Sequence, residues 1–168
     1  MNVIYIAIVV VAGYLLGSLS ISILLSKNLL GRDVRRHGSG NAGATNMARV
    51  FGMHAGLLTL AGDMLKAAAA MLLGFWLLGD TGMALGGVAC LLGHCFPVLH
   101  GFKGGKGVSS GAMVALMIDW RVFLCVVGVF LAGAFLTKKV SFGSICGALT
   151  IFISAAALGV STPRLILA

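Results

Sequence analysis

A polar, glycine-rich cassette with the sequence GRDVRRHGSGNAGATN runs from Gly31 to Asn46. Its glycines at positions 38, 40 and 43 (Gly38, Gly40 and Gly43) have the spacing G-x-G-x-x-G. Because glycines carry no side chains, consecutive backbone N–H groups in such a run can converge on a phosphate. Hydroxyl, amide and guanidinium donors are added by Ser39, Asn41, Thr45, Asn46 and Arg49. The cassette therefore predicts an anion-binding loop; the alternative is a flexible polar loop without a ligand.

A dinucleotide-binding interpretation of these glycines fails on its context. That fingerprint follows a β-strand inside a βαβ unit, with an acidic residue about 20 residues further on. Asp63 satisfies the second condition only. An apolar segment and an arginine-rich linker precede the glycines, and another apolar segment follows them. The sequence therefore argues against a nucleotide-binding fold.

A second polar cassette, GHCFPVLHGFKGGKGVSSG, runs from Gly93 to Gly111, and in it Lys103 and Lys106 flank Gly104 and Gly105. It is not a Walker A motif, because its final lysine precedes a glycine instead of serine or threonine. Two lysines in a glycine-rich turn make a compact phosphate site. Simple anchoring at a membrane surface is the alternative, but anchoring lysines need no unusual backbone.

Two charged residues and two histidines stand within or beside apolar segments. Asp63 and Lys66 have the i, i+3 spacing that places them on one helix face, which favours a structural ion pair over direct substrate contact. His94 and His100 are candidate general bases. Since no acidic residue adjoins His94 in the sequence, we interpret it as a hydrogen-bonding partner near a helix end.

Serines follow a lysine pair in KKVSFGS, residues 138–144. Ser141 and Ser144 stand where another apolar segment begins, so they are candidate helix N-caps. The free N–H groups and positive dipole end of such a helix would equally favour an anion. Both interpretations remain open at this point.

The composition identifies the solvent of this chain. Of its 168 residues, 60% are hydrophobic and only 10% are charged, and the mean hydropathy is +1.09. Soluble domains carry about 25% charged residues, so this chain has too little polar surface to face water. The net charge of +8 indicates cations gathered at one membrane surface.

The four cysteines lie in apolar segments without C-x-x-C spacing, which predicts neither disulfides nor a zinc site.

Charged residues divide the chain into apolar runs that predict an all-α, polytopic membrane bundle of about six transmembrane helices in a single domain, residues 1–168. The runs cover residues 1–26, 50–62 with 67–79, 81–102, 107–118, 122–137 and 140–163. The first run has no positive n-region and is long enough to span, so a signal peptide is not expected.

Six crossings would place nine lysines and arginines on one side, which the positive-inside rule identifies as the cytoplasm. Tyr5, Trp76 and Trp120 would then mark the outer interface. The amino terminus and Ala168 are both expected outside.

Segments rich in glycine and alanine, such as residues 67–70, 82–87 and 128–135, predict close helix packing. All the polar cassettes converge on the cytoplasmic face, where one pocket could hold more than one phosphate.

The two cassettes closely resemble the leading motifs of the bacterial acyl-phosphate:glycerol-3-phosphate acyltransferases, the PlsY family. DMLK and VSFGS also resemble segments of that family, and the likeness extends over roughly residues 10–160. The resemblance implies an integral membrane enzyme of the bacterial inner membrane that makes lysophosphatidic acid. Its expected partners are glycerol 3-phosphate, a fatty acyl phosphate donor and membrane lipids. Acyl-CoA, acyl carrier protein, nucleic acid, metals and cofactors are not expected.

The resemblance also implies roles for the motif residues. The residues assigned to catalysis are Ser39, Arg49, Lys103, Lys106 and Ser141. The residues assigned to substrate or phosphate binding are Gly38, Gly40, Asn41, Gly43, Thr45, Asn46, His94, Gly104 and Gly105. Members of the family usually continue through a seventh apolar segment to a basic tail, so we expect this chain to lack the last helix and tail of the family.

Two other classes of protein fit parts of the pattern. A membrane transporter of organic phosphates would use the same cations, but such proteins usually show repeats and a site at the membrane midplane. A membrane scaffold rich in small residues would not need phosphate-type loops. Formation of lysophosphatidic acid separates the enzyme from both alternatives.

Overall fold

The computed structural model describes residues 2–160, and every regular element in that range is helical. The helices are α1 (Val3–Ser18), α2 (Ile21–Leu24), α3 (Ala44–Phe51), α4 (Met53–Cys95), α5 (Val108–Ile118), α6 (Trp120–Thr137) and α7 (Val140–Ala157). Short helical turns lie at Leu25–Leu29, Val34–Arg36 and Val98–His100. The predicted end of the last run, at residue 163, and the predicted position of Ala168 lie outside the described residues.

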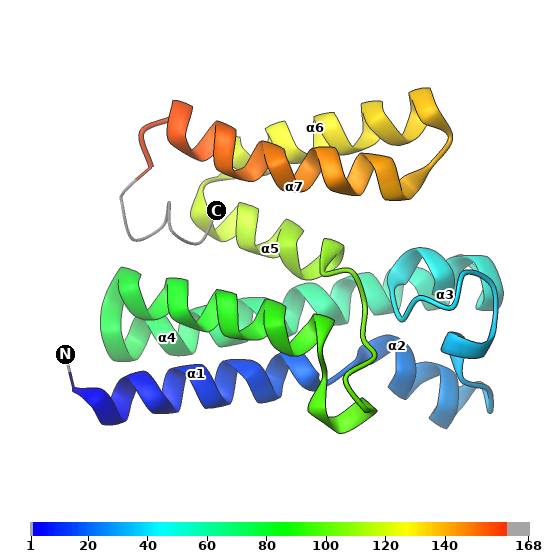
Figure 1. Cartoon of the computed structure of the whole chain (residues 1–168), viewed down its shortest axis with the longest axis horizontal. Coiled ribbons are helices and arrows are strands. Elements are labelled where there is room, and N and C mark those ends of the chain that lie inside the picture. The colour runs from blue at the N-terminus through cyan, green and yellow to red at the C-terminus, as the bar shows by residue number, and fades with distance from the viewer. Residues whose placement is uncertain (1, 161–168) are drawn as a thin grey trace.

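Helix α4 is a hairpin of two antiparallel halves (Figure 1). The chain reverses at Gly79, whose φ of 61° and ψ of −147° are not helical. The described chain therefore contains six apolar helical segments (α1, the two halves of α4, α5, α6 and α7), as the apolar runs predict. Two boundaries were wrong. The second half ends at Cys95 and not near residue 102, because proline at position 97 lacks the N–H that would continue the helix. A separate helix, α3, begins at Ala44, before the predicted second run.

The surface of the bundle is apolar, as expected for a protein whose helices face lipid. Four stretches are long and apolar enough to cross a membrane, and the longest holds both halves of α4. Large apolar side chains face outward along the helices, with Trp76 81% exposed and Phe135 85% exposed. Helix α5 has 11 residues. At 1.5 Å per residue it is about 16 Å long, roughly half of a hydrocarbon core of about 30 Å.

Small residues set the distances between helices, as the glycine-rich segments predict. A Cβ atom on Gly17 would collide with the carbonyl oxygen of Cys90, so α1 packs directly on the backbone of the second half of α4. Within the α4 hairpin, Gly86 similarly meets the carbonyl oxygen of Ala70. A Cβ on Gly133 of α6 would lie 3.2 Å from the Cα of Gly143 in α7. Close packing of this kind is the main attraction between helices in lipid.

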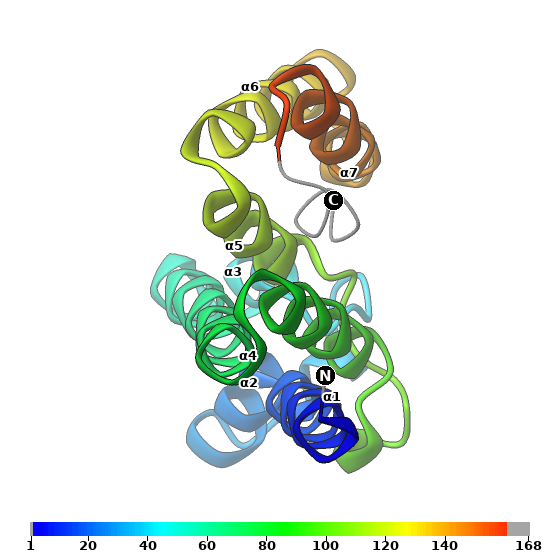
Figure 2. The same cartoon turned by 90° about the vertical axis from the view of Figure 1, so that its left-hand side faces the viewer.

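Helix α5 joins two parts of the bundle. In Figure 2 it lies between the α6–α7 hairpin and the group formed by α1 and α4. A buried cluster that includes Met71, Met83, Val114, Ile118 and Val122 connects α4, α5 and α6. This arrangement holds the start of α5 beside the other connections at the same end of the molecule.

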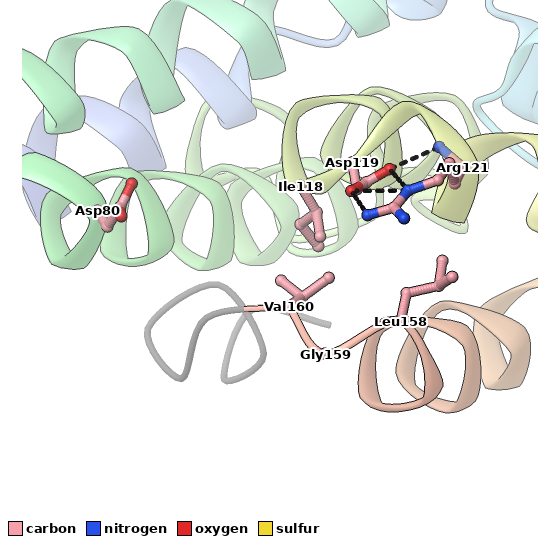
Figure 3. Close-up of a pocket in the computed structure, with 7 residues that line it drawn as sticks. All are labelled: Asp80, Ile118, Asp119, Arg121, Leu158, Gly159 and Val160. Atoms are coloured by element: carbon pink, nitrogen blue, oxygen red, sulfur yellow. Dashed lines mark hydrogen bonds and ion pairs between the residues drawn. The ribbon is translucent and has the colours of Figure 1, made fainter.

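The two ends of the bundle differ. We call one end the polar end: it carries α3, the α4–α5 connection and the α6–α7 turn (Figure 1). The other, the distal end, carries the start of α1, the reversal at Gly79 and the α5–α6 corner. A pocket of about 340 Å³ at the distal end is lined by residues that include Asp80, Asp119 and Arg121 (Figure 3). Tyr5, Trp76 and Trp120, which were predicted to mark the outer interface, lie in segments at the distal end and are exposed.

Candidate active site

The first loop, residues 30–43, is shaped by one buried side chain at the start of α3. Asn46 Oδ1 accepts a hydrogen bond from the backbone N–H of Ser39 at 2.9 Å. Its Nδ2 donates to the carbonyl oxygens of Val34, His37 and Asn41 at 3.0–3.2 Å. Because these contacts use the whole amide, Asn46 orders the loop and has no free donor for a phosphate. The structure therefore gives Asn46 a role in loop structure, and the binding role expected for it stays a prediction.

Glycine is required where this loop turns. Gly38 and Gly40 have φ values of 59° and 72°, in the left-handed region that other residues avoid. A Cβ atom on Gly38 would also collide with Asn46 Oδ1. Both residues, together with Ser39, lie exposed. The predicted glycine spacing therefore forms a tight turn that presents its backbone to the outside.

Free backbone donors lie where the end of the first loop meets the amino end of α3. Gly43 precedes the helix without a side-chain cap. In the described part of the chain, the backbone N–H groups of residues 41–45 form no hydrogen bond. Thr45 and Arg49 are exposed one helical turn apart on α3. Unpaired N–H groups at a helix start, with an arginine nearby, suit an anion.

The second loop, residues 96–107, folds back on the end of α4. The N–H of Gly105 donates to the carbonyl oxygen of His94 at 3.1 Å, and the N–H of Gly104 donates to that of Cys95 at 3.3 Å. These glycine amides therefore cap α4, and the phosphate-binding role that the resemblance implies for both glycines stays a prediction. A Cβ on Gly105 would lie 2.7 Å from the carbonyl oxygen of Ala42, so the two loops touch.

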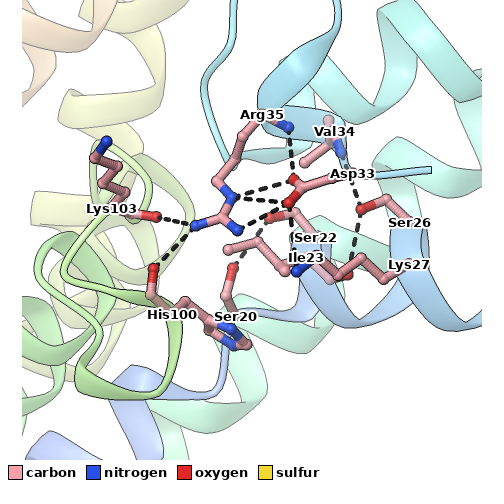
Figure 4. A network of polar contacts seen from close by, with 10 residues as sticks. All are labelled: Ser20, Ser22, Ile23, Ser26, Lys27, Asp33, Val34, Arg35, His100 and Lys103. Atoms are coloured by element: carbon pink, nitrogen blue, oxygen red, sulfur yellow. Dashed lines mark hydrogen bonds and ion pairs between the residues drawn. The ribbon is translucent and has the colours of Figure 1, made fainter.

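An arginine fastens the second loop to the first (Figure 4). Arg35 binds Asp33 through two nitrogens, with Nη2 to Oδ2 at 2.8 Å and Nε to Oδ1 at 3.1 Å. Its Nη1 donates across the chain to the carbonyl oxygen of His100 at 2.9 Å and, more weakly, to that of Lys103 at 3.5 Å. Lys27 adds an ion pair to Asp33 at 3.4 Å. This connection could not be predicted from the sequence, because His100 and Lys103 lie 65 and 68 residues after Arg35.

These contacts shift the protonation of the Asp33–Arg35 pair. The hydrogen bond from the Arg35 side chain holds the pKa of Asp33 well below its usual range. The same hydrogen bond raises the pKa of Arg35. Both groups therefore stay charged across the physiological range. The pair leaves the remaining exposed lysines and arginines of the polar end, including Arg49, Lys103 and Lys106, without a neutralising carboxylate among the described loop residues.

The second loop also contacts α7. Lys106 Nζ donates to Ser141 Oγ at 2.8 Å, and both side chains are exposed. The predicted serine N-caps were wrong: α7 begins at Val140, and no side chain caps it. Ser144 Oγ instead donates to the carbonyl oxygen of Val140 at 2.8 Å. Ser141 thus stands in the first turn, where the positive end of the helix dipole meets the lysine.

His94 is buried, and the acidic partner that it lacks in the sequence is supplied by the fold. Its Nδ1 lies 3.6 Å from Asp63 Oδ1, and Asp63 also pairs with Lys66 at 3.1 Å. The structural ion pair predicted for Asp63 and Lys66 is confirmed. His94 lies inside the bundle and is only 4% exposed, so the structure places it among buried partners, and its expected contact with substrate stays a prediction. Among the described residues no group of three or more His, Cys, Asp or Glu is arranged to hold a metal.

The polar end therefore gathers three features: two interlocked glycine-rich loops, exposed cations, and the amino ends of α3, α5 and α7. Gly107, with φ of 76°, is the N-cap of α5 and directly follows Lys106. Gly43 and the Asn41 side chain lie half-buried at the junction with α3. These features define a polytopic α-helical membrane protein with one cationic surface.

Comparison with known proteins identifies the family. The glycerol-3-phosphate acyltransferase family model matches residues 7–168. A glycerol-3-phosphate acyltransferase from Finegoldia magna is 39% identical over 153 residues, which cover 91% of this chain and 77% of the relative. The Bacillus subtilis protein of the same name is 42% identical over 139 residues, covering 83% of this chain and 72% of the relative. The chain belongs to the glycerol-3-phosphate acyltransferase family, which confirms the resemblance of its motifs.

Solved structures agree with the fold. The crystal structure of PlsY (YgiH), an integral membrane glycerol 3-phosphate acyltransferase in its glycerol 3-phosphate form, matches with a TM-score of 0.89 and 34% identity. The match covers 96% of this chain and 82% of that chain. Its lysophosphatidic acid form matches with a TM-score of 0.86 and 32% identity. The predicted class, an all-α membrane bundle, is thereby confirmed.

Proposed function

We propose that this chain transfers a fatty acyl group to the 1-hydroxyl of glycerol 3-phosphate and so forms lysophosphatidic acid. The supporting observation is the convergence of both glycine-rich loops with Lys106 and Ser141 at one end of the bundle. The related PlsY structures, which are described as glycerol 3-phosphate and lysophosphatidic acid forms, support the acceptor and the product.

The donor in this proposal is a fatty acyl phosphate, without a requirement for acyl-CoA or acyl carrier protein. Both reactants then carry a phosphate, which suits a surface with several exposed cations. Lys103, Lys106, Arg49 and the free N–H groups at the start of α3 hold the two phosphates. The acyl chain lies among the apolar helices, which already face lipid.

The reaction requires mainly that the two reactants be held in the correct orientation. The 1-hydroxyl oxygen attacks the carbonyl carbon of the acyl phosphate, an ester bond forms, and the bond from carbonyl carbon to phosphate oxygen breaks. A phosphate oxygen of the donor takes the hydroxyl proton, so the products are the ester and inorganic phosphate. Well-oriented reactants alone lower a barrier by about 7–11 kcal/mol. Lysine donors stabilise the negative charge that develops in the transition state.

The polar end faces the cytoplasm of a bacterial inner membrane in this proposal, and the amino terminus lies outside. The clustered lysines and arginines of the loops support this orientation. Ser39→Cys places a thiol on the exposed first loop. A membrane-impermeant maleimide should label it in inside-out vesicles and not in right-side-out vesicles. Labelling in right-side-out vesicles alone would reverse the orientation.

The activity test supplies the purified chain with acyl phosphate and radiolabelled glycerol 3-phosphate. Labelled lysophosphatidic acid should form, and acyl-CoA in place of acyl phosphate should give none. Product from acyl-CoA alone would refute the proposed donor. Uptake of label into proteoliposomes without any product would favour an organic phosphate transporter instead.

A further inference from the structure

Three ionisable side chains meet inside the bundle beneath the polar end. Asp63 and Lys66 come from the first half of α4, and His94 comes from the second half. Asp63 is 1% exposed, and its Oδ1 lies 3.1 Å from Lys66 Nζ and 3.6 Å from His94 Nδ1. Charged groups inside a membrane protein are costly and are usually kept for a role. Their surroundings indicate what that role is.

Lys66 holds the place where the chain leaves α1 toward the first loop. Its Nζ donates to the carbonyl oxygens of Gly17 at 2.9 Å and Leu19 at 2.8 Å. These carbonyls belong to the last turn and C-cap of α1, just before the chain bends into α2. A lysine at a helix carboxyl end satisfies free carbonyls and complements the dipole. The ammonium therefore fixes the end of α1, from which the chain reaches the first loop through α2 and the turn Leu25–Leu29.

His94 holds the second loop. Its carbonyl oxygen accepts the N–H of Gly105 at 3.1 Å. A Cβ atom on Gly105 would collide with His94 Nε2, so the imidazole lies directly against the loop. Ser110 of α5 joins the cluster from another side. Its Oγ lies 3.3 Å from the carbonyl oxygen of Asp63 and 3.4 Å from His94 Nδ1.

We propose that Asp63, Lys66, His94 and Ser110 form a positioning centre that sets the second loop against the first, and so places Lys106 for acyl transfer. The centre does not touch substrate, because its side chains are buried. It links α1, both halves of α4, and α5: the second loop connects α4 to α5, and α1 leads through α2 to the first loop. This inference rests on the proposed function.

The mildest test removes one contact of the centre. Ser110→Ala deletes a hydroxyl in a buried site and leaves the charges intact. We expect kcat/KM for glycerol 3-phosphate to fall about threefold or more, the effect of one hydrogen bond, while Tm changes little. Ser154→Ala is the matched control: Ser154 is also a buried helical serine, 8% exposed against 0% for Ser110, and among the described residues it is bonded only to the α7 carbonyls of Thr150 and Ile151. It should leave kcat/KM unchanged.

Removal of charge separates positioning from stability. Asp63→Asn or Lys66→Met alone leaves an unpaired buried charge and should lower Tm. The double variant removes both charges and should recover most of the Tm. A positioning role predicts that its kcat/KM stays at least about tenfold below that of the unaltered chain, since the carbonyls of Gly17 and Leu19 lose their donor. His94→Asn, which can place an amide near Nδ1, should retain more activity than His94→Ala.

The outcomes distinguish this inference from the proposed function. A double variant that regains both Tm and kcat/KM would show that the cluster is only structural. If the double variant fails to fold, Ser110→Ala decides: kcat/KM equal to that of Ser154→Ala overturns the positioning role. Absence of product from the unaltered chain would overturn the proposed function itself, and the inference with it.

Discussion

The same local motif occurs at both ends of the bundle. At the polar end Asp33 accepts the backbone N–H of Arg35 at 3.0 Å and pairs with its guanidinium at 2.8 Å. At the distal end Asp119 accepts the backbone N–H of Arg121 at 2.8 Å and pairs with its guanidinium at 2.8 Å. Each aspartate precedes a helical turn as its N-cap. The local geometry of the two D-x-R caps is nearly identical.

The difference lies in what else each arginine reaches. Arg35 Nη1 continues across the chain to the carbonyl oxygen of His100, so this cap also joins two loops. Within the described residues, the side-chain nitrogens of Arg121 bind only Asp119. The same sequence motif therefore makes the same cap twice, and within the described residues Arg35 reaches a second partner whereas Arg121 does not. Variants at the two ends can be compared directly.

The largest expected contrast concerns the cations. Lys106→Ala should lower kcat/KM for acyl transfer by about 100-fold or more, the size of effect seen when one donor to a developing oxyanion is lost. Lys103→Ala should act in the same direction. Arg121→Ala, which removes a cation from the distal end, should leave kcat/KM unchanged. Equal losses at both ends would show that general surface charge, not a site, explains the cations.

A smaller contrast is expected between two glycines. A methyl group on Gly105 would collide with His94 Nε2 and approach the carbonyl oxygen of Ala42, whereas nothing lies within 4 Å of the corresponding position on Gly128. Overpacking costs about 1–3 kcal/mol, so Gly105→Ala should lower kcat/KM by about tenfold and also lower Tm. Gly128→Ala should match the unaltered chain in both measurements. Full activity of Gly105→Ala would mean that the two loops need not touch.

The two D-x-R caps give the next contrast. Arg35→Ala should raise KM for glycerol 3-phosphate several-fold, because each hydrogen bond of the clamp contributes about 1 kcal/mol. Arg35→Lys should not restore it, since lysine lacks the planar fork that reaches Asp33 and His100 together. Arg121→Ala and Arg121→Lys, assayed in parallel, should have normal KM values. A normal KM for Arg35→Lys would show that the positive charge at position 35, and not the geometry of its hydrogen bonds, explains the effect.

The smallest expected effect is a dependence of stability on pH. The folded pKa of Asp33 is lowered, so its contribution is complete above its unfolded pKa of about 4 and is lost as the pH falls toward the folded value. Asp33→Asn should therefore lower Tm by a constant amount between about pH 5 and about pH 8, because this range lies above the unfolded pKa of about 4. The difference from the unaltered chain should shrink below about pH 4. A difference that grows on acidification would contradict the assignment.

The course of the helices could be predicted from the sequence because charge and apolarity alternate along the chain. Lysine pairs, aspartates and glycine-rich turns mark the ends of the long segments. Gly86 and Gly133 pack closely against neighbouring helix backbone, as the glycine-rich segments predict. The exceptions are local. Pro97 ends α4 early, and α3 begins within a stretch interpreted as a loop, because Asn46 draws the loop carbonyls around the start of that helix.

The partners of polar side chains could not be predicted in the same way. The residues of the cassettes were identified correctly as a group that gathers at one end, but several have different tasks within it. The Asp63 partner of His94 is 31 residues away in sequence, on the other half of a hairpin. Ser141 accepts a hydrogen bond from a lysine 35 residues earlier instead of capping its own helix. Only the packing of α4, α5 and α7 decides these pairings.

We propose that α3, which follows the first loop, and the second loop form one site for the two phosphates. A double-mutant cycle on kcat/KM with Arg49→Ala, Lys106→Ala and their combination tests it most directly. Cations that serve one bound pair of anions are energetically coupled, so the combined loss should differ from the sum of the single losses by at least about 0.5 kcal/mol. Losses that add within error would show that Arg49 and Lys106 act at separate places and would contradict the claim.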